Sequence, residues 1–323
     1  MKAARFPGGK RFAFTIIDDT DVATVANVSP VYDLLASLGM RTTKTVWPFR
    51  WHGSGSDFAS SETLEDPAYL AFVQRLADEG FEIASHGATM ESSDRDTTVA
   101  AIGRHCELFG TAPRVYANHS YNRENVYWGV DRIDNPLLKR LYSRLNGQPR
   151  GYYQGHVPGS DWWWGDLCCS THDYVRNLTF SSLNLLAVNP SMPYTDTARP
   201  HVRSWFSATD AEDCREFVEL FTEERVARLE VEGGVCILAT HLGKDFTQNG
   251  RVHPQVEQIL RGIARRSGWF VPVSPLLDWL SAQQPETATG VLPHAEWSRM
   301  QWQWAFDLLR RRVQKRWADS RTS

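Results

Sequence analysis

The chain has 323 residues, enough to bury a large core as one large α/β domain or two smaller ones. Its composition, 42% hydrophobic and 23% charged, is typical of a soluble globular protein, and the net charge of -3 gives no indication of a nucleic-acid partner. The N-terminus has no apolar signal-peptide core, no apolar run reaches membrane-span length, and the five cysteines have no disulfide spacing. We therefore expect a cytoplasmic location.

The first predicted element is a buried β-strand, Phe12–Ile17, which leads directly into Asp18, Asp19 and Asp21. Aspartate is common in turns and helix caps, which would explain one of these residues but not all three. Adjacent buried carboxylates repel one another and need a cation or a shared proton. We therefore favour a metal-binding or catalytic carboxylate pair at the end of this strand.

Strands and helices then alternate along the chain, which predicts parallel strands joined by right-handed crossovers. The further predicted strands are Arg41–Trp47, Phe81–Ala84, Arg114–Ala117, Val235–Ala239 and Trp269–Val273. The predicted helices are a segment from Ser29-Pro30 to Gly39, another from Asp66-Pro67 to Gly80, and Thr97–Phe109, Asp210–Glu230, Pro254–Arg266 and Pro275–Ala282.

The alternation stops in a long aromatic segment around residues 120–209. One helix (Pro136–Leu145) and strands near Leu183–Val188 and His201–Trp205 are predicted within it. Insertions of this size in α/β proteins usually build the binding surface.

We expect residues 1–282 to form one domain, and 283–323 to form a linker and a C-terminal amphipathic, basic helix. Tryptophan, methionine, leucine and phenylalanine recur at helical spacing between residues 297 and 317, and five basic residues crowd the end of this helix. Docking on the protein body is the favoured interpretation. Peripheral contact with the inner face of an anionic membrane is the alternative.

Four polar clusters each follow a predicted strand at its C-terminal end: Asp18–Asp19, His86, Asn118–His119 and His241. In parallel α/β proteins the site lies at this end of the strands. One aspartate and two histidines, with water in the open position, are an ordinary catalytic zinc set. The sequence therefore predicts a metal centre here.

Two of these motifs are similar to those of the polysaccharide deacetylase family of metal-dependent carbohydrate esterases. The segment Thr15–Thr20 resembles the family's T-F-D-D-G motif, and Leu238–His241 resembles its late L-x-x-H motif. The resemblance covers roughly residues 11–273 and implies an irregular (β/α) barrel with seven or eight mostly parallel strands. It also implies that Asp18 is the general base, Asp19 a metal ligand and His241 the general acid.

The family's second motif, H-[ST]-x-x-H, departs from its pattern, because Met90 stands where the second metal-binding histidine is expected after His86. A thioether is a poor ligand for a borderline cation such as zinc. We infer that His119 supplies the missing ligand, so that Asp19, His86 and His119 would hold a divalent metal, expected to be Zn²⁺. Asn118 would bind the metal or donate a hydrogen bond to the developing oxyanion.

Substrate-binding residues are also expected in the aromatic segment. Trp162, Trp163 and Trp164 lie among glycine and polar residues, and we expect them to line an acetyl or sugar pocket rather than fill a core. Arg176 is expected to pair with Asp18, as an arginine does in the family.

The resulting hypothesis is a metal-dependent hydrolase that removes an N- or O-acyl group from a carbohydrate or glycan precursor. One alternative is a glycoside hydrolase on a related barrel, with Asp18 or Asp21 facing Asp161 or Asp166. The other is a non-catalytic carbohydrate-binding protein, which Met90 motivates.

Overall fold

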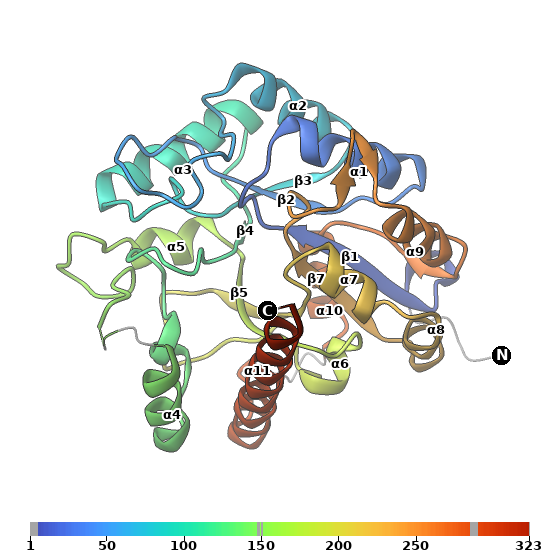
Figure 1. Cartoon of the computed structure of the whole chain (residues 1–323). Helices are drawn as coiled ribbons and strands as arrows, with labels where there is room; N and C mark the ends of the chain where they lie inside the picture. The colour runs from blue at the N-terminus through green and yellow to red at the C-terminus, as the bar shows by residue number, and fades with distance from the viewer. Residues whose placement is uncertain (1–5, 147–148, 150, 285–289, 323) are drawn as a thin grey trace.

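The computed structural model describes residues 6–146, 149, 151–284 and 290–322, and its centre is a barrel of parallel strands (Figure 1). The barrel strands are β1 (Phe12–Asp18), β2 (Thr43–Val46), β3 (Glu82–Ser85), β4 (Val115–Tyr116), β5 (Tyr174–Phe180), β6 (Ser204–Asp210) and β7 (Val235–Thr240). They pair in chain order, and pairing of β7 with β1 closes the sheet. An eighth strand, β10 (Gly268–Trp269), pairs with the first residues of β1, whereas β2 pairs with the last. The expected (β/α) barrel with seven or eight strands is confirmed.

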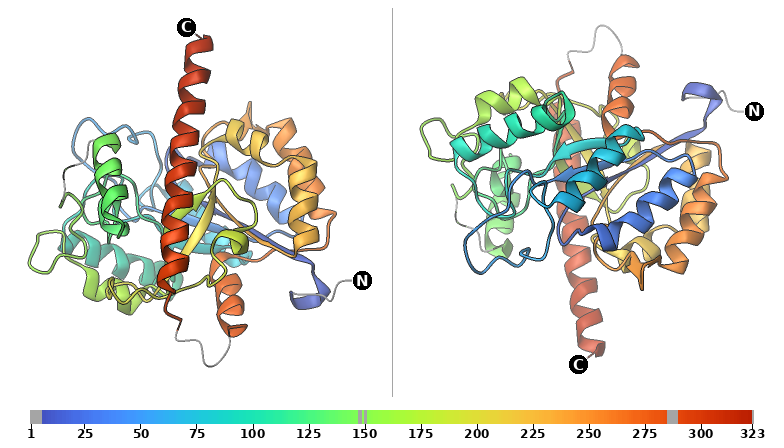
Figure 2. Two further views of the ribbon diagram at one scale, coloured as in Figure 1. Left: turned by 90° about the horizontal axis from the view of Figure 1, so that it is seen from below. Right: turned by 90° about the horizontal axis from the view of Figure 1, so that it is seen from above.

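Helices surround this barrel in all three views (Figures 1 and 2). The main α-helices are α1 (Val25–Ser37), α2 (Pro67–Asp78), α3 (Arg95–Phe109), α4 (Pro136–Asn146), α5 (Gly165–Thr171), α6 (Leu185–Val188), α7 (Cys214–Leu220), α8 (Glu223–Glu232), α9 (Pro254–Ala264), α10 (Val273–Ala282) and α11 (His294–Thr322). Two 3₁₀ helices, η1 (Pro7–Gly9) and η2 (Gly129–Arg132), and a small hairpin of β8 (Thr247–Gln248) and β9 (Arg251–Val252) complete the described elements.

Strand β1 is buried on both faces and divides two hydrophobic cores. Phe12, Phe14 and Ile16 pack in the core shared with α1 and α2, whereas Ala13 and Ile17 belong to the other core. Successive side chains of a strand point to opposite faces. Asp18 therefore lies on the same face as Ile16, and Asp19 on the same face as Ile17. This alternation determines where the two aspartates go.

Several predicted element boundaries are wrong. Helix α1 begins at Val25, where Thr24 and Asn27 form a capping box, and Pro30 lies inside the helix rather than at its start. The strand predicted near Leu183–Val188 is instead the short helix α6, capped by Asn184. The long helix predicted over Asp210–Glu230 is interrupted at Phe221, after which Thr222 caps α8.

The predicted C-terminal helix exists as α11, and its first half docks on the body. Trp297, Met300 and Trp304 are buried in the core that also contains β5 and β6. Further along, Asp307 accepts a hydrogen bond from the backbone N–H of Ser181, just after β5, and Arg311 pairs with Asp210 at the end of β6. The helix therefore runs toward the C-terminal ends of the strands, and its last part projects beyond the body (Figure 2). Among the described helices, none combines the length and apolarity needed to cross a membrane.

Candidate metal centre

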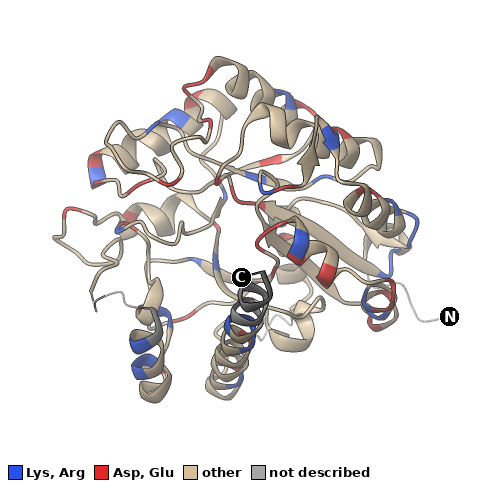
Figure 3. Cartoon of the chain, in the orientation of Figure 1, with Lys and Arg blue, Asp and Glu red and all other residues tan. Residues whose placement is uncertain are grey.

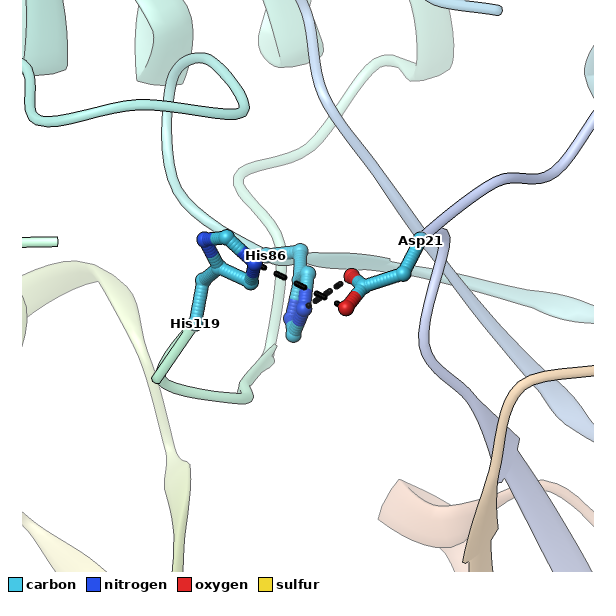
Figure 4. Close-up of side chains that lie close together, drawn as sticks. All are labelled: Asp21, His86 and His119. Atoms are coloured by element: carbon cyan, nitrogen blue, oxygen red, sulfur yellow. Dashed lines mark hydrogen bonds and ion pairs between the residues drawn. The ribbon is translucent and has the colours of Figure 1, made fainter. Parts of the chain in front are cut away.

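Three buried side chains from three different loops meet at the C-terminal end of the barrel (Figure 4). Asp21 follows β1, His86 follows β3 and His119 follows β4, and each offers a ligand atom within 4.8 Å of the others. His86 Nε2 lies 3.2 Å from Asp21 Oδ1, and His119 Nε2 lies 3.6 Å from Asp21 Oδ2. The predicted histidines are thus brought together, and the carboxylate that meets them is that of Asp21.

Both imidazole rings present Nε2 to this point. Nδ1 of His86 donates to the carbonyl oxygen of Ala117 at 2.8 Å, and Nδ1 of His119 lies 3.0 Å from Oδ1 of Asn122. His119 Nε2 is buried and has no hydrogen-bond partner within the described part of the chain. A buried imidazole nitrogen without a partner costs free energy, whereas two neutral imidazoles and one carboxylate suit a divalent cation such as zinc. The residues present therefore fit a metal ion.

The backbone that carries Asp21 is strained. Val22, the next residue, has a φ of 53°, a left-handed conformation that is a genuine outlier for a β-branched residue. Its N–H donates to Ser61 Oγ at 2.9 Å, and its carbonyl accepts from Asn27 Nδ2 at 2.8 Å. A strained conformation of this kind persists only where surrounding contacts hold it in place, and such conformations are frequent at functional sites.

Glycine is required beside this strained turn. A Cβ on Gly243, in the loop after β7, would lie 2.9 Å from the carbonyl oxygen of Val22 and 3.1 Å from Cα of Ala23. The loop after β7, which carries His241, therefore packs directly against the backbone that positions Asp21.

Asp19 does not join the Asp21–His86–His119 group but binds Arg176 of β5. The guanidinium donates two hydrogen bonds, from Nη1 to Oδ1 at 2.8 Å and from Nη2 to Oδ2 at 2.6 Å. Burial alone would raise the pKa of Asp19, but the charge and hydrogen bonds of Arg176 hold that pKa below its usual value. Asp19 is therefore an oriented, ionised carboxylate at the edge of the centre.

Asp18 lies on the opposite face of β1, and its side chain is fully buried. Its Oδ2 lies 2.9 Å from Nζ of Lys44 and accepts from the Tyr32 hydroxyl at 3.0 Å. Its Oδ1 accepts from the backbone N–H of Leu242 at 2.8 Å. The predicted pairing of Arg176 with Asp18 is wrong, because the alternation of β1 turns Asp18 away from β5.

His241 approaches the centre from the loop after β7. Its Nε2 lies 3.3 Å from Asp21 Oδ2, and its Nδ1 lies 2.8 Å from the carbonyl oxygen of Glu212. Burial lowers the pKa of His241, but the Asp21 carboxylate more than offsets this effect and raises that pKa above its usual value. His241 therefore faces the Asp21–His86–His119 group with an imidazole that binds a proton more tightly than a free histidine does.

The other predicted binding residues have different surroundings. Asn118 is buried; its Oδ1 accepts from Val126 N at 3.1 Å, and its Nδ2 has no partner among the described residues. Trp163 packs edge-on against His201, and Trp162 lies beneath the Arg123 guanidinium. Trp164 is only 1% exposed and belongs to the hydrophobic core, so the expectation that it lines a pocket is wrong. Its ring packs against Tyr116 of β4, and its Nε1 donates to the backbone carbonyl of Glu124. Both contacts hold the ring inside the core.

Aromatic rings that the sequence pattern did not single out surround His119. Its ring centroid lies 4.8 Å from that of Phe58, 5.4 Å from that of Trp47 and 6.2 Å from that of Tyr121. Tyr121 is 57% exposed, so its ring is accessible to a ligand beside His119. The sequence analysis also missed Asp21 as a member of the candidate ligand group, and only the unusual density of aspartates after β1 signalled it.

Solved structures with this architecture exist at low sequence identity. A putative polysaccharide deacetylase from Mycobacterium smegmatis is 15% identical, with a TM-score of 0.50 over 90% of this chain and 98% of that chain. A probable polysaccharide deacetylase from Pseudomonas aeruginosa PAO1 is 13% identical, with a TM-score of 0.50 over 88% and 96% of the two chains. The allantoinase Puue is 12% identical, with a TM-score of 0.51 over 89% and 96%. No family model and no curated protein matches the chain. The chain thus shares its fold with polysaccharide deacetylases.

Proposed function

We propose that the chain is a metal-dependent hydrolase that removes an N- or O-acyl group, such as acetyl, from a carbohydrate or glycan precursor. The observation that carries this proposal is the buried convergence of Asp21 with two histidine Nε2 atoms, one of which has no hydrogen-bond partner within the described residues. The shared fold with polysaccharide deacetylases supports a carbohydrate substrate.

Asp21, His86 and His119 would hold the metal, for which we propose Zn²⁺ because of the two imidazoles and one carboxylate. A metal ion bound there supplies Lewis acidity, which lowers the pKa of a water molecule and polarises a substrate carbonyl. This ligand set differs from the sequence prediction in one member, because Asp21 takes the place of Asp19.

Asp19 is the proposed general base in place of Asp18. Asp18 lies on the opposite face of β1, where its fully buried side chain binds Lys44, Tyr32 and Leu242 and does not face the Asp21–His86–His119 group. Asp19 is ionised and held in one orientation by Arg176, so it can accept the proton of the attacking water. The resemblance implies an arginine beside the base, and the carboxylate that Arg176 binds is that of Asp19.

His241 is the proposed general acid, because its Nε2 lies 3.3 Å from Asp21 Oδ2 beside the centre and its pKa is raised above the usual value. It would donate a proton to the departing nitrogen or oxygen of the substrate. The Nδ2 of Asn118, which has no partner among the residues that the structure describes, would donate a hydrogen bond to the oxyanion that forms from the substrate carbonyl. The exposed ring of Tyr121, together with Phe58, would provide an apolar face for the sugar ring.

Metal content tests the proposal first. The wild-type protein, purified and reconstituted with Zn²⁺, should contain about one metal ion per chain by elemental mass spectrometry, since the three ligands form one set. His119→Ala and Asp21→Asn should lose it, whereas Asp18→Asn should not. Release of acetate from acetylated chito- and xylo-oligosaccharides should stop on chelation and return with the metal. Turnover that resists chelation would contradict the proposal.

The same assay separates the two alternatives. Release of a free reducing sugar without acetate would favour the glycoside hydrolase. Binding of oligosaccharide without metal and without turnover would favour the non-catalytic protein. Asp166, a candidate acid of the glycoside hydrolase, is engaged by Arg95 in two hydrogen bonds at 2.8 Å and is largely exposed, which does not favour an acid with a raised pKa.

The exposed side chains of helix α11 favour a second partner, an anionic membrane surface. Trp302, Phe306, Leu309 and Val313 recur on one side of the helix and are between 39% and 66% exposed. The exposed arginines 299 and 310 flank this apolar stripe, and Figure 3 shows further basic residues on α4 and α11. An apolar stripe between basic side chains is the pattern of a helix that lies in the interface of an anionic bilayer. We propose that α11 makes this contact, which would suit a lipid-linked glycan precursor.

A further inference from the structure

The side chain of Asn122 is the hydrogen-bond partner of His119 Nδ1, whereas the carboxylate of Asp21 lies on the Nε2 side of the ring. His119 Nδ1 lies 3.0 Å from Asn122 Oδ1. If this oxygen accepts, Nδ1 carries the proton and Nε2 keeps its lone pair for a metal ion. If the amide were turned over, its NH₂ group would face Nδ1 and the tautomer would reverse, so that Nε2 would carry the proton.

The orientation of the Asn122 amide is fixed by its opposite end. Its Nδ2 lies 2.8 Å from Glu124 Oε1, 3.0 Å from the carbonyl oxygen of Glu91 and 3.2 Å from that of Thr89. All three of these atoms accept hydrogen bonds, so an amide oxygen placed among them would be repelled. The NH₂ group therefore faces Glu124, and Oδ1 faces His119.

Glu124 also ties together the two loops that carry the histidines. It is 1% exposed, its Oε2 accepts from the backbone N–H of Ser93 at 3.1 Å, and Ser93 belongs to the loop after β3 that begins with His86. Gly87 packs against this pair of side chains: a Cβ on Gly87 would lie 3.6 Å from both Glu124 Oε1 and Asn122 Nδ2. Both oxygens of Glu124 accept hydrogen bonds, so its role requires a side chain with two acceptor oxygens, which glutamine does not have.

We propose that Glu124 and Asn122 are positioning residues of the metal centre. Glu124 fixes the Asn122 amide, and Asn122 fixes the tautomer in which His119 presents Nε2 beside Asp21 and His86. His86 needs no such device, because the backbone carbonyl of Ala117 fixes its tautomer. Side chains that orient a metal-binding histidine typically change metal affinity when they are replaced. The inference rests on the proposed metal-binding function.

The experiment compares Zn²⁺ affinity of the full chain, by competition with a chromogenic chelator, in the wild type, Asn122→Leu and Glu124→Gln. We expect Zn²⁺ affinity to fall by about 10- to 100-fold in both variants. The matched control is Glu82→Gln, since Glu82 is a half-buried carboxylate that also accepts from Ser274 and Thr43, but at the opposite end of β3. This control should retain wild-type affinity, whatever it does to stability.

A second measurement does not depend on metal binding. Two-bond ¹H–¹⁵N correlation spectra of the metal-free protein should show His119 as the Nδ1–H tautomer in the wild type and Glu82→Gln, and as a mixture in the other two variants. Unchanged affinity and an unchanged tautomer in Glu124→Gln and Asn122→Leu would overturn the inference. If the wild type binds no Zn²⁺, the proposed function fails, and the spectra still decide whether Asn122 and Glu124 set the tautomer. Glu124→Gln preserves side-chain shape, so it keeps the test available if Asn122→Leu does not fold.

Discussion

At the residue scale, the alternation of side chains along β1 places the adjacent Asp18 and Asp19 on opposite faces of the strand. Asp19 faces Arg176, and Asp18 faces Lys44. We expect Asp19→Asn to lower kcat by about 10²- to 10⁴-fold, and also to lower the free energy of unfolding, because the buried Arg176 loses its partner. Asp18→Asn should leave the buried Lys44 charge uncompensated and lower the free energy of unfolding by about 3–5 kcal/mol, without a comparable loss of kcat in the protein that remains folded. Urea denaturation and acetate release measure the two effects, and a stable but inactive Asp18→Asn protein would restore Asp18 as the base.

Glu124 gives a residue-scale prediction for pH. Burial raises its pKa to about 7 in the folded protein from an ordinary value of 4.5, so the folded state binds the proton more tightly than the unfolded state does. Its contribution to stability is complete below pH 4.5 and is lost as the pH rises to about 7. Between these limits, the free energy of unfolding of the wild type should fall by about 3 kcal/mol relative to that of Glu124→Gln. Urea denaturation across this pH range checks the sign, and parallel curves would show that Glu124 does not titrate there.

At the element scale, continuous apolar runs in the sequence predicted most of the strands that carry the site. Strands β1, β3 and β7, and the positions of His86, His119 and His241 just beyond strand ends, could be located because each run ends abruptly in polar residues. Strand β5 could not be found this way. Its Arg176 and Asn177 are buried and bind Asp19 and Tyr194, so the strand carries polar residues where a pattern search expects apolar ones. The choice between Asp19 and Asp21 also lay beyond the sequence, because it depends on the left-handed turn at Val22.

The contact between that turn and the loop after β7 makes an element-scale prediction. In Gly243→Ala, the new Cβ would clash with the backbone of Val22, so one loop must move. We expect a loss of about 1–3 kcal/mol in the free energy of unfolding and weaker Zn²⁺ binding, because Asp21 moves with Val22. Gly262→Ala on α9 is the control, since nothing lies near its Cβ and alanine should stabilise the helix by about 1 kcal/mol. Equal Zn²⁺ affinity in the two variants would show that the contact does not position Asp21.

At the scale of the whole molecule, positive charge is concentrated in one segment of α11, although the protein carries a net negative charge. The net charge is -3, yet residues 310–316 include five basic residues and no acidic one. They begin where α11 reaches the ends of β5 and β6, since Arg311 pairs with Asp210 at the end of β6. This is also the end of the barrel that carries the candidate metal centre. A membrane bound along this helix would therefore lie at the same end of the barrel as the candidate metal centre, which is the arrangement that the proposed lipid-linked substrate requires.

Vesicle sedimentation with the full chain tests this orientation. We expect binding to vesicles that contain phosphatidylglycerol, weaker binding at high salt and little binding to pure phosphatidylcholine, because the basic residues supply about 1 kcal/mol each near an anionic surface. Phe306→Ser and Arg310→Gln should each weaken binding without loss of stability, since both side chains are exposed. Val99→Ser, at an exposed apolar residue of α3, is the matched control and should bind like the wild type. If Phe306→Ser instead abolishes a concentration-dependent dimer while the wild type ignores anionic vesicles, the apolar stripe serves a second copy of the chain and the membrane contact is wrong.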